Sequence, residues 1–533
     1  MIATSVMPDF RHAEQEYCAK TSSEHRKKYA QFFTPLSIAT CMTDWLISSK
    51  QGTTMLLDPA FGLGHLLASM DADRLANIEI VGYELDTHAF SEASRLWDRC
   101  SSITLRNEDF LVHPPESLFD AILCNPPYLK FHDYDNVSAI AKINATFGTT
   151  LNGFTNIHSL FILQALSCLK KGGRAAFIVP SEFLNSDYGV HVKDALLKTG
   201  MLRYVMIIDF SANVFKDALT TSCILLFAND EHKSRVEFLT AQSEETLFTL
   251  QESVQMYPKM NGTSQAVSDI IPAAKWRRYY QERASEQYRN LIPLRQYGKV
   301  SRGIATGDNA FFTFNRAKQQ KWHIPDKYLL PCLTKAAQCG DIAYTNANHS
   351  RNLKANESVM LLNAEIGENE AVKRYLKHGE EQGTHTRFLT KNRTPWYALE
   401  RRAPAPILVT VFNRNGLRFV WNEANVYNLT AYHCFYPNLF AQGNEKLLFA
   451  YLITDVAKEI FRDNRREYGD GLEKFEPNDL NSSLVLDLSV IDSDVQKTIE
   501  EHISHMLFQH SAGQKAVETL QALNEIFVSL LVQ

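Results

Sequence analysis

Met55-Leu-Leu-Asp-Pro-Ala-Phe-Gly-Leu-Gly-His-Leu-Leu67 joins a short apolar strand, a tight turn with two glycines and the start of a helix. Gly62 and Gly64 let the backbone approach a ligand closely, at the strand edge where open α/β sheets bind cofactors. Asp58 ends the strand, and an acid there suits a cationic ligand group better than a pyrophosphate. A Gly-x-Gly alone is also typical of an ordinary strand-to-helix turn, so the surrounding chain has to decide.

Short apolar runs alternate with helical patterns from residue 38 to about residue 230. The runs expected to form strands are Thr54–Asp58, Ile78–Glu84, Ile103–Arg106, Phe119–Cys124, Ala175–Val179, Tyr204–Asp209 and Ser222–Phe227. The helical stretches fall near 38–48, 64–71, 87–99, 155–170 and 188–199. This alternation predicts a doubly wound, Rossmann-like α/β sheet of seven mostly parallel strands. No long helix separates the last two strands, so we expect the final strand to run antiparallel.

Two local signals refine the helix boundaries. Asp86 is expected to cap the third helix at its N-terminus, since aspartate accepts hydrogen bonds from the first free N–H groups of a helix. Gly172-Gly173 is expected to end the fourth helix.

Acidic side chains stand at the ends of three successive strands. Glu84 follows the second strand about 20 residues beyond Gly64, where an acid accepts hydrogen bonds from both ribose hydroxyls. Asp109 follows the third strand and can accept from an adenine amino group, with Leu85 and Phe110 closing on the ring faces. Each acid alone is more often a helix cap or a solvated charge. Together with Asp58, they indicate a nucleotide-binding edge.

Asn125-Pro126-Pro127-Tyr128 follows the fourth strand. The asparagine side-chain oxygen and the Pro126 carbonyl can each accept one N–H of an –NH2 group, which turns its delocalised lone pair toward an incoming methyl group. The two prolines stiffen the loop, and Tyr128 offers a flat face on which a planar substrate can stack. Asn-Pro is also common in simple turns. After three acids at three strand ends, the tetrapeptide predicts methyl transfer to an amide or amino nitrogen.

In this order the motifs resemble those of the gamma-class adenine-N6 DNA methyltransferases, the TaqI-type and Eco57I-type modification enzymes. That family carries an F-x-T-P-like cofactor motif before the glycine turn, matched here by Phe33-Thr34-Pro35, and the resemblance covers residues 25–230. It implies methyl transfer from S-adenosylmethionine to N6 of an adenine flipped out of duplex DNA. The catalytic residues would be Asn125, Pro126, Pro127 and Tyr128.

The resemblance also implies a cofactor site and a second stacking residue. The cofactor would be bound by Thr34, Pro35, Asp58, Ala60, Gly62, Gly64, Glu84, Leu85, Asp109, Phe110 and Asn125. Phe215 would stack on the face of the target base opposite Tyr128, although Lys216 stands where the family has a proline. No metal ion is needed for this chemistry, and none is expected.

The length of 533 residues predicts two or three domains. We expect an N-terminal extension over residues 1–28, a catalytic domain over 29–270, a mixed α/β DNA target-recognition domain over 271–484 and a helical segment over 485–533. Ile499 and Ile503 belong to an apolar helical spacing in the last segment, which favours a helical pair covering the domain over a dimer surface. A monomer is therefore expected.

Two basic stretches in the second half contain aromatic residues. Residues 275–302 hold eight Lys/Arg against two Glu, and residues 387–418 hold seven against one. Such patches are expected of a nucleic-acid binder, although a solvated helix face has the same composition. The residues expected to contact DNA are Arg302, Lys391, Arg393, Arg401, Arg402 and Lys474. Ser301–Phe312 and the stretch from Tyr468 to Leu480 resemble loops of the recognition domain in Eco57I-type enzymes.

Composition excludes several other classes. The net charge of −5 rules out a uniformly basic coat but allows a local basic cleft. The nine cysteines never have zinc-ligand spacing, which predicts neither structural zinc nor disulfides and fits the bacterial cytoplasm. There is no apolar signal core and no run of about 18 apolar residues, so we expect neither secretion nor a membrane span.

Three alternatives remain open at this point. Glutamine-N5 and RNA-adenine methyltransferases also use Asn-Pro-Pro-Tyr, but the upstream Phe-Phe-Thr-Pro and the long second half favour duplex DNA. The chain can instead be one subunit of a larger defence complex that needs a separate specificity chain, which the basic and aromatic second half argues against. The third alternative, a nuclease fused into the same chain, is disfavoured because no convincing nuclease motif is present and almost no length is left for one. A companion restriction endonuclease would be a separate protein and is not physically required.

Overall fold

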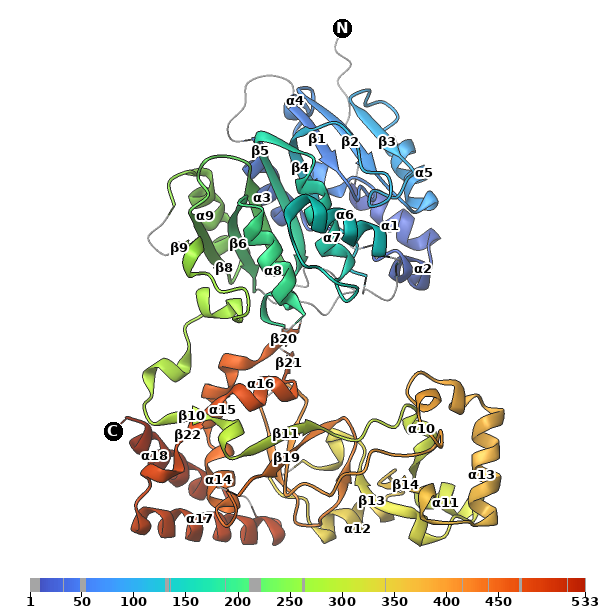
Figure 1. Ribbon diagram of the computed structural model, residues 1–533, viewed down its shortest axis with the longest axis vertical. Helices are drawn as coiled ribbons and strands as arrows, with labels where there is room; N and C mark the ends of the chain where they lie inside the picture. The colour runs from blue at the N-terminus through green and yellow to red at the C-terminus, as the bar shows by residue number, and fades with distance from the viewer. Residues whose placement is uncertain are drawn as a thin grey trace. The chain divides into compact units, whose positions relative to one another are not determined.

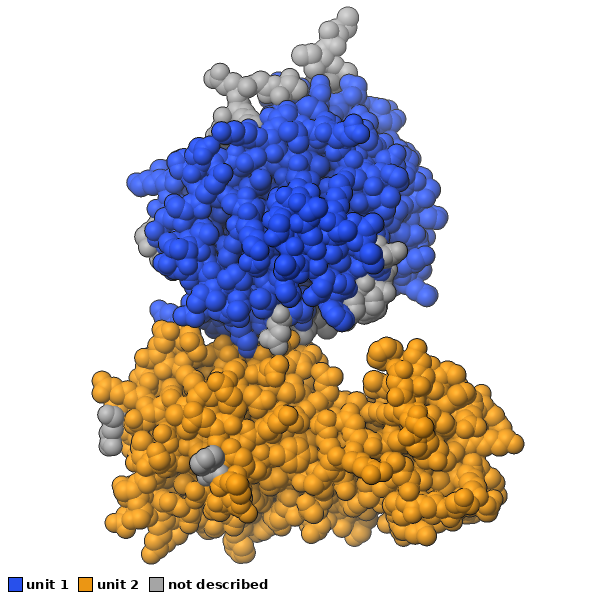
Figure 2. Space-filling view, in the orientation of Figure 1, with its two compact units in different colours: residues 1–282, 467–471 blue, residues 283–466, 472–533 orange. Residues whose placement is uncertain are grey.

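The computed structural model describes residues 10–31, 33–47, 54–129, 134, 136–186, 188–209, 222–260, 264–340, 342–414, 416–439, 441–468, 472–514 and 516–532. The chain divides into two compact units, residues 1–282 with 467–471 and residues 283–466 with 472–533, which Figure 2 colours separately. The predicted boundary between catalytic and recognition domains, at residues 270 and 271, falls near this division.

Nine strands of unit 1 form one sheet within the described residues, in the order β3-β2-β1-β4-β5-β7-β6-β8-β9 (Figure 1). Their bounds are β1 Thr54–Asp58, β2 Ile78–Tyr83, β3 Ile103–Arg106, β4 Phe119–Cys124, β5 Leu169–Pro180, β6 Leu202–Ile208, β7 Ser222–Ala228, β8 Arg235–Ala241 and β9 Gln265–Ala266. β1 pairs in parallel with β2 and β4, whereas β7 runs antiparallel to both β5 and β6. The doubly wound sheet and its antiparallel seventh strand are confirmed.

β8 and β9 extend the sheet beyond the seven predicted strands. β8 pairs in parallel with β6, and β9 pairs antiparallel with β8. The sequence of β8, Arg-Val-Glu-Phe-Leu-Thr-Ala, lacks the continuous apolar run expected of a buried parallel strand, yet Glu237 within it is buried.

Helices cover both faces of this sheet (Figure 1). Their bounds are α1 Phe10–Lys20, α2 Ser23–Lys28, α3 Leu36–Ile47, α4 Ala72–Leu75, α5 Thr87–Leu96, α6 Val137–Phe147, α7 Ile157–Leu166, α8 Gly189–Lys198 and α9 Glu244–Gln255. Successive side chains of a strand point to opposite faces. In β4, Ile122 therefore packs in the cluster under α6, α7 and α8, and Leu123 packs in the cluster with α3 and α9.

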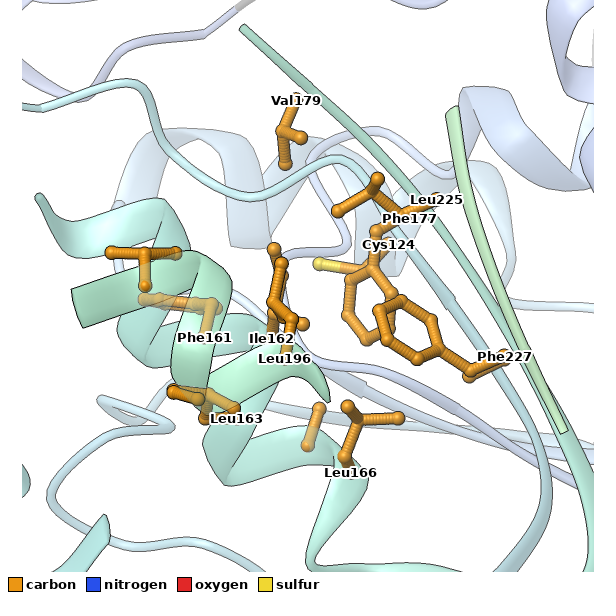
Figure 3. Packing of buried hydrophobic residues seen from close by; sticks show 14 of the residues in the cluster. Cys124, Phe161, Ile162, Leu163, Leu166, Phe177, Val179, Leu196, Leu225 and Phe227 are labelled. Atoms are coloured by element: carbon orange, nitrogen blue, oxygen red, sulfur yellow. The ribbon is translucent and has the colours of Figure 1, made fainter. Parts of the chain in front are cut away.

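α7 is the most enclosed of these helices. All ten of its residues are buried, and Figure 3 shows Phe161, Ile162, Leu163 and Leu166 directed at the same core as Phe177 and Phe227 of the sheet. A helix buried on every side leaves little freedom to the strands beneath it, since interiors pack at crystal density. The strand ends that carry the sequence motifs are thus held by a rigid core.

Two of the predicted helix boundaries have different outcomes. Asp86 caps α5, and its Oδ1 accepts a hydrogen bond of 3.2 Å from the N–H of His88, as predicted. The prediction that Gly172-Gly173 ends a helix is wrong. α7 already ends at Leu166, and both glycines lie inside β5 at a register shift between the pairs of Phe119 and Ala121. Leu166 and Leu169 have the spacing of one helix face, so the sequence predicted a helix that continues beyond the observed end of α7.

The segment after Gly64 also differs from the expected helix over 64–71. His65–Ser69 form a 3-10 helix of five residues, which we label η1. Gly64 begins it with a left-handed φ of 84°, and Gly62 has a φ of 55°. Both glycines of the turn therefore adopt a backbone conformation that disfavours a side chain.

Unit 2 consists of small sheets and helices. Its strands are β10 Leu291–Pro293, β11 Gly298–Arg302, β12 Thr313–Phe314, β13 Leu329–Leu333, β14 Met360–Leu362, β15 Ile407–Thr410, β16 Phe412–Asn413, β17 Phe419–Trp421, β18 Tyr427–Asn428, β19 Tyr432–Pro437, β21 Leu472–Lys474 and β22 Leu484–Leu486. A further strand, β20 Arg466–Tyr468, begins in unit 2, and its last two residues are assigned to unit 1. Two four-stranded sheets, in the orders β11-β19-β15-β17 and β12-β14-β13-β18, are its largest within the described residues. The predicted mixed α/β architecture of the second half is confirmed.

The helices of unit 2 include a long pair near the end of the chain. The bounds are α10 Asn309–Phe312, α11 Arg316–Trp322, α12 Asn346–Lys354, α13 Glu370–Glu381, α14 Glu445–Leu452, α15 Asp455–Phe461, α16 Pro477–Ser482, α17 Ser493–Ser511 and α18 Val517–Val532. Ile499 and Ile503 of α17 are buried in one cluster with α14, α15 and α18. In the part of the chain that the structure describes, no helix is long and apolar enough to cross a membrane.

The glycine turn yields a test of stability. A Cβ added at Gly64 would lie 2.6 Å from Nε1 of Trp97, which donates a hydrogen bond to the Leu63 carbonyl, whereas a Cβ at Gly62 meets nothing within 4 Å. Gly62→Ala should therefore lower the free energy of unfolding only by the conformational strain, about 1 kcal/mol. Gly64→Ala should lose a further 1–3 kcal/mol or so of unfolding free energy from the clash. Urea denaturation of both full-length variants measures the difference, and equal losses would contradict it.

Candidate active site

A pocket opens where β1, β2, β3 and β4 end, and the segment following each of these strands lines it. Its volume is about 1030 Å³, including its opening to solvent. Of the predicted cofactor residues, those that line it are Thr34, Ala60, Gly62, Glu84, Leu85, Asp109, Phe110 and Asn125. Pro127 is also a lining residue, whereas Pro35, Asp58 and Gly64 are not among those that line it.

The Glu84 carboxylate holds the glycine turn against the end of β2. Its Oε2 accepts a hydrogen bond of 2.9 Å from the Gly62 N–H, and its Oε1 accepts one of 2.7 Å from the Asp86 N–H. Burial raises the pKa of Glu84 to about 7, despite these two backbone donors. A carboxylate has about four lone-pair sites, so the group retains capacity to accept a hydrogen bond from a ligand.

Asp58 is fully buried at the end of β1. Its Oδ1 accepts a hydrogen bond of 3.1 Å from the Ala60 N–H, and its Oδ2 has no hydrogen-bond partner among the described residues. Burial raises the pKa of Asp58 to about 8. A buried acceptor without a donor costs about 1–3 kcal/mol, which a bound cation or donor would recover. Pro59 and Ala60, the two residues that follow Asp58, line the pocket.

Asp109 follows β3 and is already hydrogen-bonded within the protein. Oδ1 accepts from the Leu111 N–H at 2.9 Å, and Oδ2 accepts from the Tyr134 hydroxyl at 2.8 Å. Phe110 is buried with its ring edge-on to Tyr83, at a centroid distance of 5.5 Å, while Leu85 is exposed. One side of this subsite is therefore a fixed aromatic wall and the other a solvent-facing leucine.

The Asn125 side chain lies on the pocket, next to Thr34 of the F-x-T-P-like motif. Asn125 Nδ2 donates a hydrogen bond of 3.0 Å to the Thr34 Oγ1. Thr34 is buried and precedes α3, so it is held by the helix that follows it. The two sequence motifs, 91 positions apart, therefore meet through one side-chain hydrogen bond.

Tyr128 is fixed through its hydroxyl group, which donates a hydrogen bond of 3.2 Å to the carbonyl of Ile178 in β5. Burial raises the pKa of this hydroxyl well above its ordinary value, so it stays neutral at physiological pH. Pro126, between Asn125 and Pro127, is buried. Phe215, the predicted second stacking residue, lies outside the described residues, and its pairing with Tyr128 stays a prediction.

The N-terminal helices provide a pocket wall that sequence reasoning missed. Tyr17 of α1 lines the pocket, although it falls in the predicted extension over residues 1–28. Its hydroxyl lies 3.0 Å from Asp86 Oδ2. The same oxygen accepts a hydrogen bond of 2.7 Å from Gln31 Nε2 and lies 2.8 Å from His25 Nε2.

Asp86 therefore connects the wall to the sheet. Burial opposes its charge, but the side-chain bonds from His25 and Gln31 hold the pKa of Asp86 below its ordinary value. Sequence carried no signal for this contact, since Glu-Leu-Asp indicated only a helix cap. Among the described residues, no group of three or more His, Cys, Asp or Glu side chains is placed to hold a metal ion.

Comparison with known proteins places this geometry in a family. The N-6 DNA methylase model matches residues 14–262, and the model of the C-terminal domain of Type II methyltransferase M.Eco57I matches residues 275–522. Type II methyltransferase M.AccI of Acinetobacter calcoaceticus is 43% identical over 517 residues, which are 96% of this chain and 95% of that protein. The chain belongs to the N6-adenine DNA methyltransferase family.

More distant relatives of this methyltransferase agree over most of its length. Type II methyltransferase M.XamI of Xanthomonas campestris pv. amaranthicola is 24% identical and covers 84% of this chain and 83% of its own. The solved structure of the Type IIL restriction–modification enzyme MmeI in complex with DNA has a TM-score of 0.56 at 14% identity, over 97% of this chain and 78% of that one. The predicted activity, adenine-specific methylation of DNA, is confirmed, and family membership implies use of S-adenosylmethionine.

Of the six residues expected to contact DNA, Lys391 and Arg401 of this methyltransferase are exposed. Arg401 is 91% exposed, and its guanidinium lies 3.6 Å from Glu365 Oε1. Arg302 is also exposed and pairs with Glu476 at 3.3 Å. These three cations are accessible to a polyanion.

The other three cations are engaged by neighbouring groups in the protein. The Arg393 guanidinium donates to the Thr306 carbonyl at 2.9 Å and to the Ala305 carbonyl. Arg402 pairs with Glu400 at 2.6 Å, and Lys474 pairs with Glu476 at 2.6 Å. Their expected DNA contacts stay predictions.

Proposed function

We propose that this chain is a self-contained, site-specific modification enzyme that methylates N6 of an adenine flipped out of duplex DNA. It would act on cytoplasmic DNA in a restriction–modification system whose endonuclease is a separate protein. The observation that carries the proposal is the meeting of Asn125 and Thr34 on a pocket walled by Glu84 and Asp109. Matches to the family cover both units, which favours built-in target recognition over a separate specificity chain.

The pocket fits S-adenosylmethionine on two counts. The Glu84 carboxylate suits ribose hydroxyls, and Asp109 with the Phe110 wall suits an adenine ring and its amino group. Asp58 does not line the pocket, so a role for its buried Oδ2 at the cationic end of the cofactor stays a prediction. When bound, the cofactor supplies an electrophilic methyl group on its sulfonium sulfur.

The chain's own residues would position the target amine. Asn125 Nδ2 donates to Thr34, so Oδ1 is the amide atom that would accept one N6–H, and the Pro126 carbonyl would accept the other. The amine lone pair is then aimed at the methyl carbon. Tyr128, fixed by its bond to Ile178, would support the ring by stacking. Positioning and polarisation of this kind account for most of the rate enhancement, with no strong base required.

Base capture has a cost that the site must offset. Taking an adenine out of a duplex requires a few kcal/mol of unstacking and unpairing. Stacking on Tyr128 and hydrogen bonding to Asn125 would recover part of it in the pocket. We expect the remainder to come from cations of unit 2 that contact the flanking duplex, such as Arg401 and Lys391.

The function is tested by giving the purified chain alone to unmethylated duplex DNA with radiolabelled S-adenosylmethionine. RNA and release-factor protein serve as competing acceptors. We expect labelling of DNA only, and mapping of N6-methyladenine in a methylation-free host carrying this gene should give one short recurring motif. A chain that is inactive until another protein is added would instead be a subunit of a larger complex.

Asn125→Ala should reduce kcat by about 100-fold or more, since one preorganised polar contact at a reacting group has this value. The affinity for S-adenosylmethionine, measured by calorimetry, should stay close to that of the wild type. Asn77→Ala, at an exposed asparagine before β2, is the matched control and should retain full activity. Substantial turnover by Asn125→Ala would remove the role assigned to this side chain.

Thr34 should act as a positioning residue for the Asn125 amide. Thr34→Val keeps the shape but removes Oγ1, and a misplaced amide should lower kcat by about 10- to 100-fold. Thr34→Ser, which keeps the acceptor, should restore kcat to near the wild-type value. If Thr34→Val instead raises only the KM for S-adenosylmethionine, the threonine serves the cofactor and not the amide.

Cofactor affinity should depend on pH near neutrality. The pKa of Glu84 is raised to about 7, so its carboxylate fraction falls from about nine-tenths at pH 8 to about one-tenth at pH 6. Affinity for S-adenosylmethionine should therefore weaken as pH falls through this range. Glu84→Gln should have a shallower pH profile, and the slope that remains should belong to Asp58, whose pKa is about 8. A wild-type profile that is flat from pH 6 to 8 would contradict this role.

A further inference from the structure

Residues 387–392 of unit 2, here called the finger, carry an unusual side chain at their tip. Phe388 is 75% exposed, more than any other phenylalanine among the described residues. Its neighbour Leu389 is also exposed. An aromatic ring held in water forgoes about 1.5–3 kcal/mol of burial energy, which becomes available when a partner covers it.

The base of the finger is braced against the turn over residues 303–308. Asp308 Oδ2 accepts a hydrogen bond of 3.1 Å from Thr384 Oγ1 and pairs with Arg387 at 3.1 Å. On the other side, the Arg393 guanidinium donates to the carbonyls of Thr306 and Ala305. Both ends of the finger are thereby fixed to one turn.

The interior of the finger is equally constrained. Thr390 is fully buried, and its hydroxyl donates to the Thr384 carbonyl. Gly307 has a left-handed φ of 85°, and a Cβ there would lie 3.0 Å from the Cβ of Leu389. Close backbone approach and buried hydrogen bonds therefore hold Phe388 outward. A rigid aromatic loses little entropy on binding, which favours a contact of high affinity for its size.

The exposed charged side chains of the finger itself are positive, and the Asp308 carboxylate that pairs with Arg387 is buried. Lys391 is exposed, with its Nζ 5.7 Å from the centroid of the Phe388 ring, and Arg387 is half-exposed. No acidic residue occurs between Glu381 and Glu400. An exposed aromatic among cations matches a partner that offers both phosphates and flat apolar faces. Base–aromatic stacking is worth about 1–3 kcal/mol per base, and each lysine or arginine at a phosphate adds salt-dependent affinity.

We propose that the finger inserts Phe388 into the base stack of duplex DNA, while Lys391 and Arg387 contact the flanking phosphates. This inference rests on the proposed function, since it assumes that the chain binds DNA by itself. Arg393 then acts as a brace for the finger, and not as a phosphate contact. Aromatic wedges of this kind unstack a base step and bend the duplex, which lowers the further cost of removing an adenine from it.

The test compares Phe388→Ala with the wild type on duplex oligonucleotides that carry the mapped recognition motif. Phe388→Ala should weaken binding and lower kcat/KM by about 10- to 100-fold, the equivalent of one lost stacking contact. The affinity for S-adenosylmethionine and the melting temperature should not change, because the ring is 75% exposed. Phe508→Ala, at a ring of α17 that is 69% exposed, is the matched control and should behave as the wild type.

Two further measurements separate stacking from general adhesion. Phe388→Trp should retain activity, and its added fluorescence should be quenched on binding DNA, as expected for an indole stacked on bases. Lys391→Gln should lower the slope of log affinity against log salt by about 1, whereas Phe388→Ala should leave the slope unchanged. If Phe388→Ala binds and methylates DNA as the wild type does, or if Phe508→Ala causes an equal loss, the proposed insertion of Phe388 is wrong. A wild-type chain that methylates no DNA would instead overturn the proposed function.

Discussion

The two backbone hydrogen bonds to the Glu84 carboxylate are the constraint on which the active-site pocket depends. One bond fixes the Gly62 turn after β1, and the other fixes the Asp86 amide after β2. Asp86 in turn caps α5 and receives the side chains of the N-terminal helices. A single acid thereby connects the turns that follow two neighbouring strands and lies two residues from Asp86, which holds the third wall. It does so at an energetic cost, because burial raises the pKa of Glu84 to about 7.

Much of unit 1 was predictable from sequence because parallel strands buried on both faces leave a strong apolar signal. β1, β3 and β4 have the predicted bounds, and the motif residues that follow them line or adjoin one pocket. The strands that were missed have weaker signals. β8 contains Arg235 and Glu237, and β9 has only two residues. The Gly172 error arose because periodicity cannot separate a continuing helix from a turn that leads into a strand.

Contacts between distant side chains were beyond prediction from sequence. Nothing in the sequence distinguishes Tyr17 or Gln31 from other polar residues, and only folding brings both to Asp86. In the second half of the chain, composition identifies two basic stretches but does not separate their exposed cations from their engaged ones. Arg393 and Arg401 lie in the same basic stretch. Arg393 donates hydrogen bonds to backbone carbonyls, whereas Arg401 is almost fully exposed. Whether a cation faces solvent is decided by the fold around it.

The dependence of the N-terminal helices on Asp86 constrains the order in which the pocket can assemble during synthesis. α1 and α2 span 11 and 6 residues, and helices this short are marginal in water by themselves. Their anchoring partner Asp86 is 61 positions beyond His25 of α2 and 69 positions beyond Tyr17 of α1. During synthesis, α1 and α2 cannot form these contacts until β2 and the Asp86 that follows it have left the ribosome. The two helices are thus made before β2 but reach their final position after it, so a nascent catalytic unit acquires this wall of its binding cleft late.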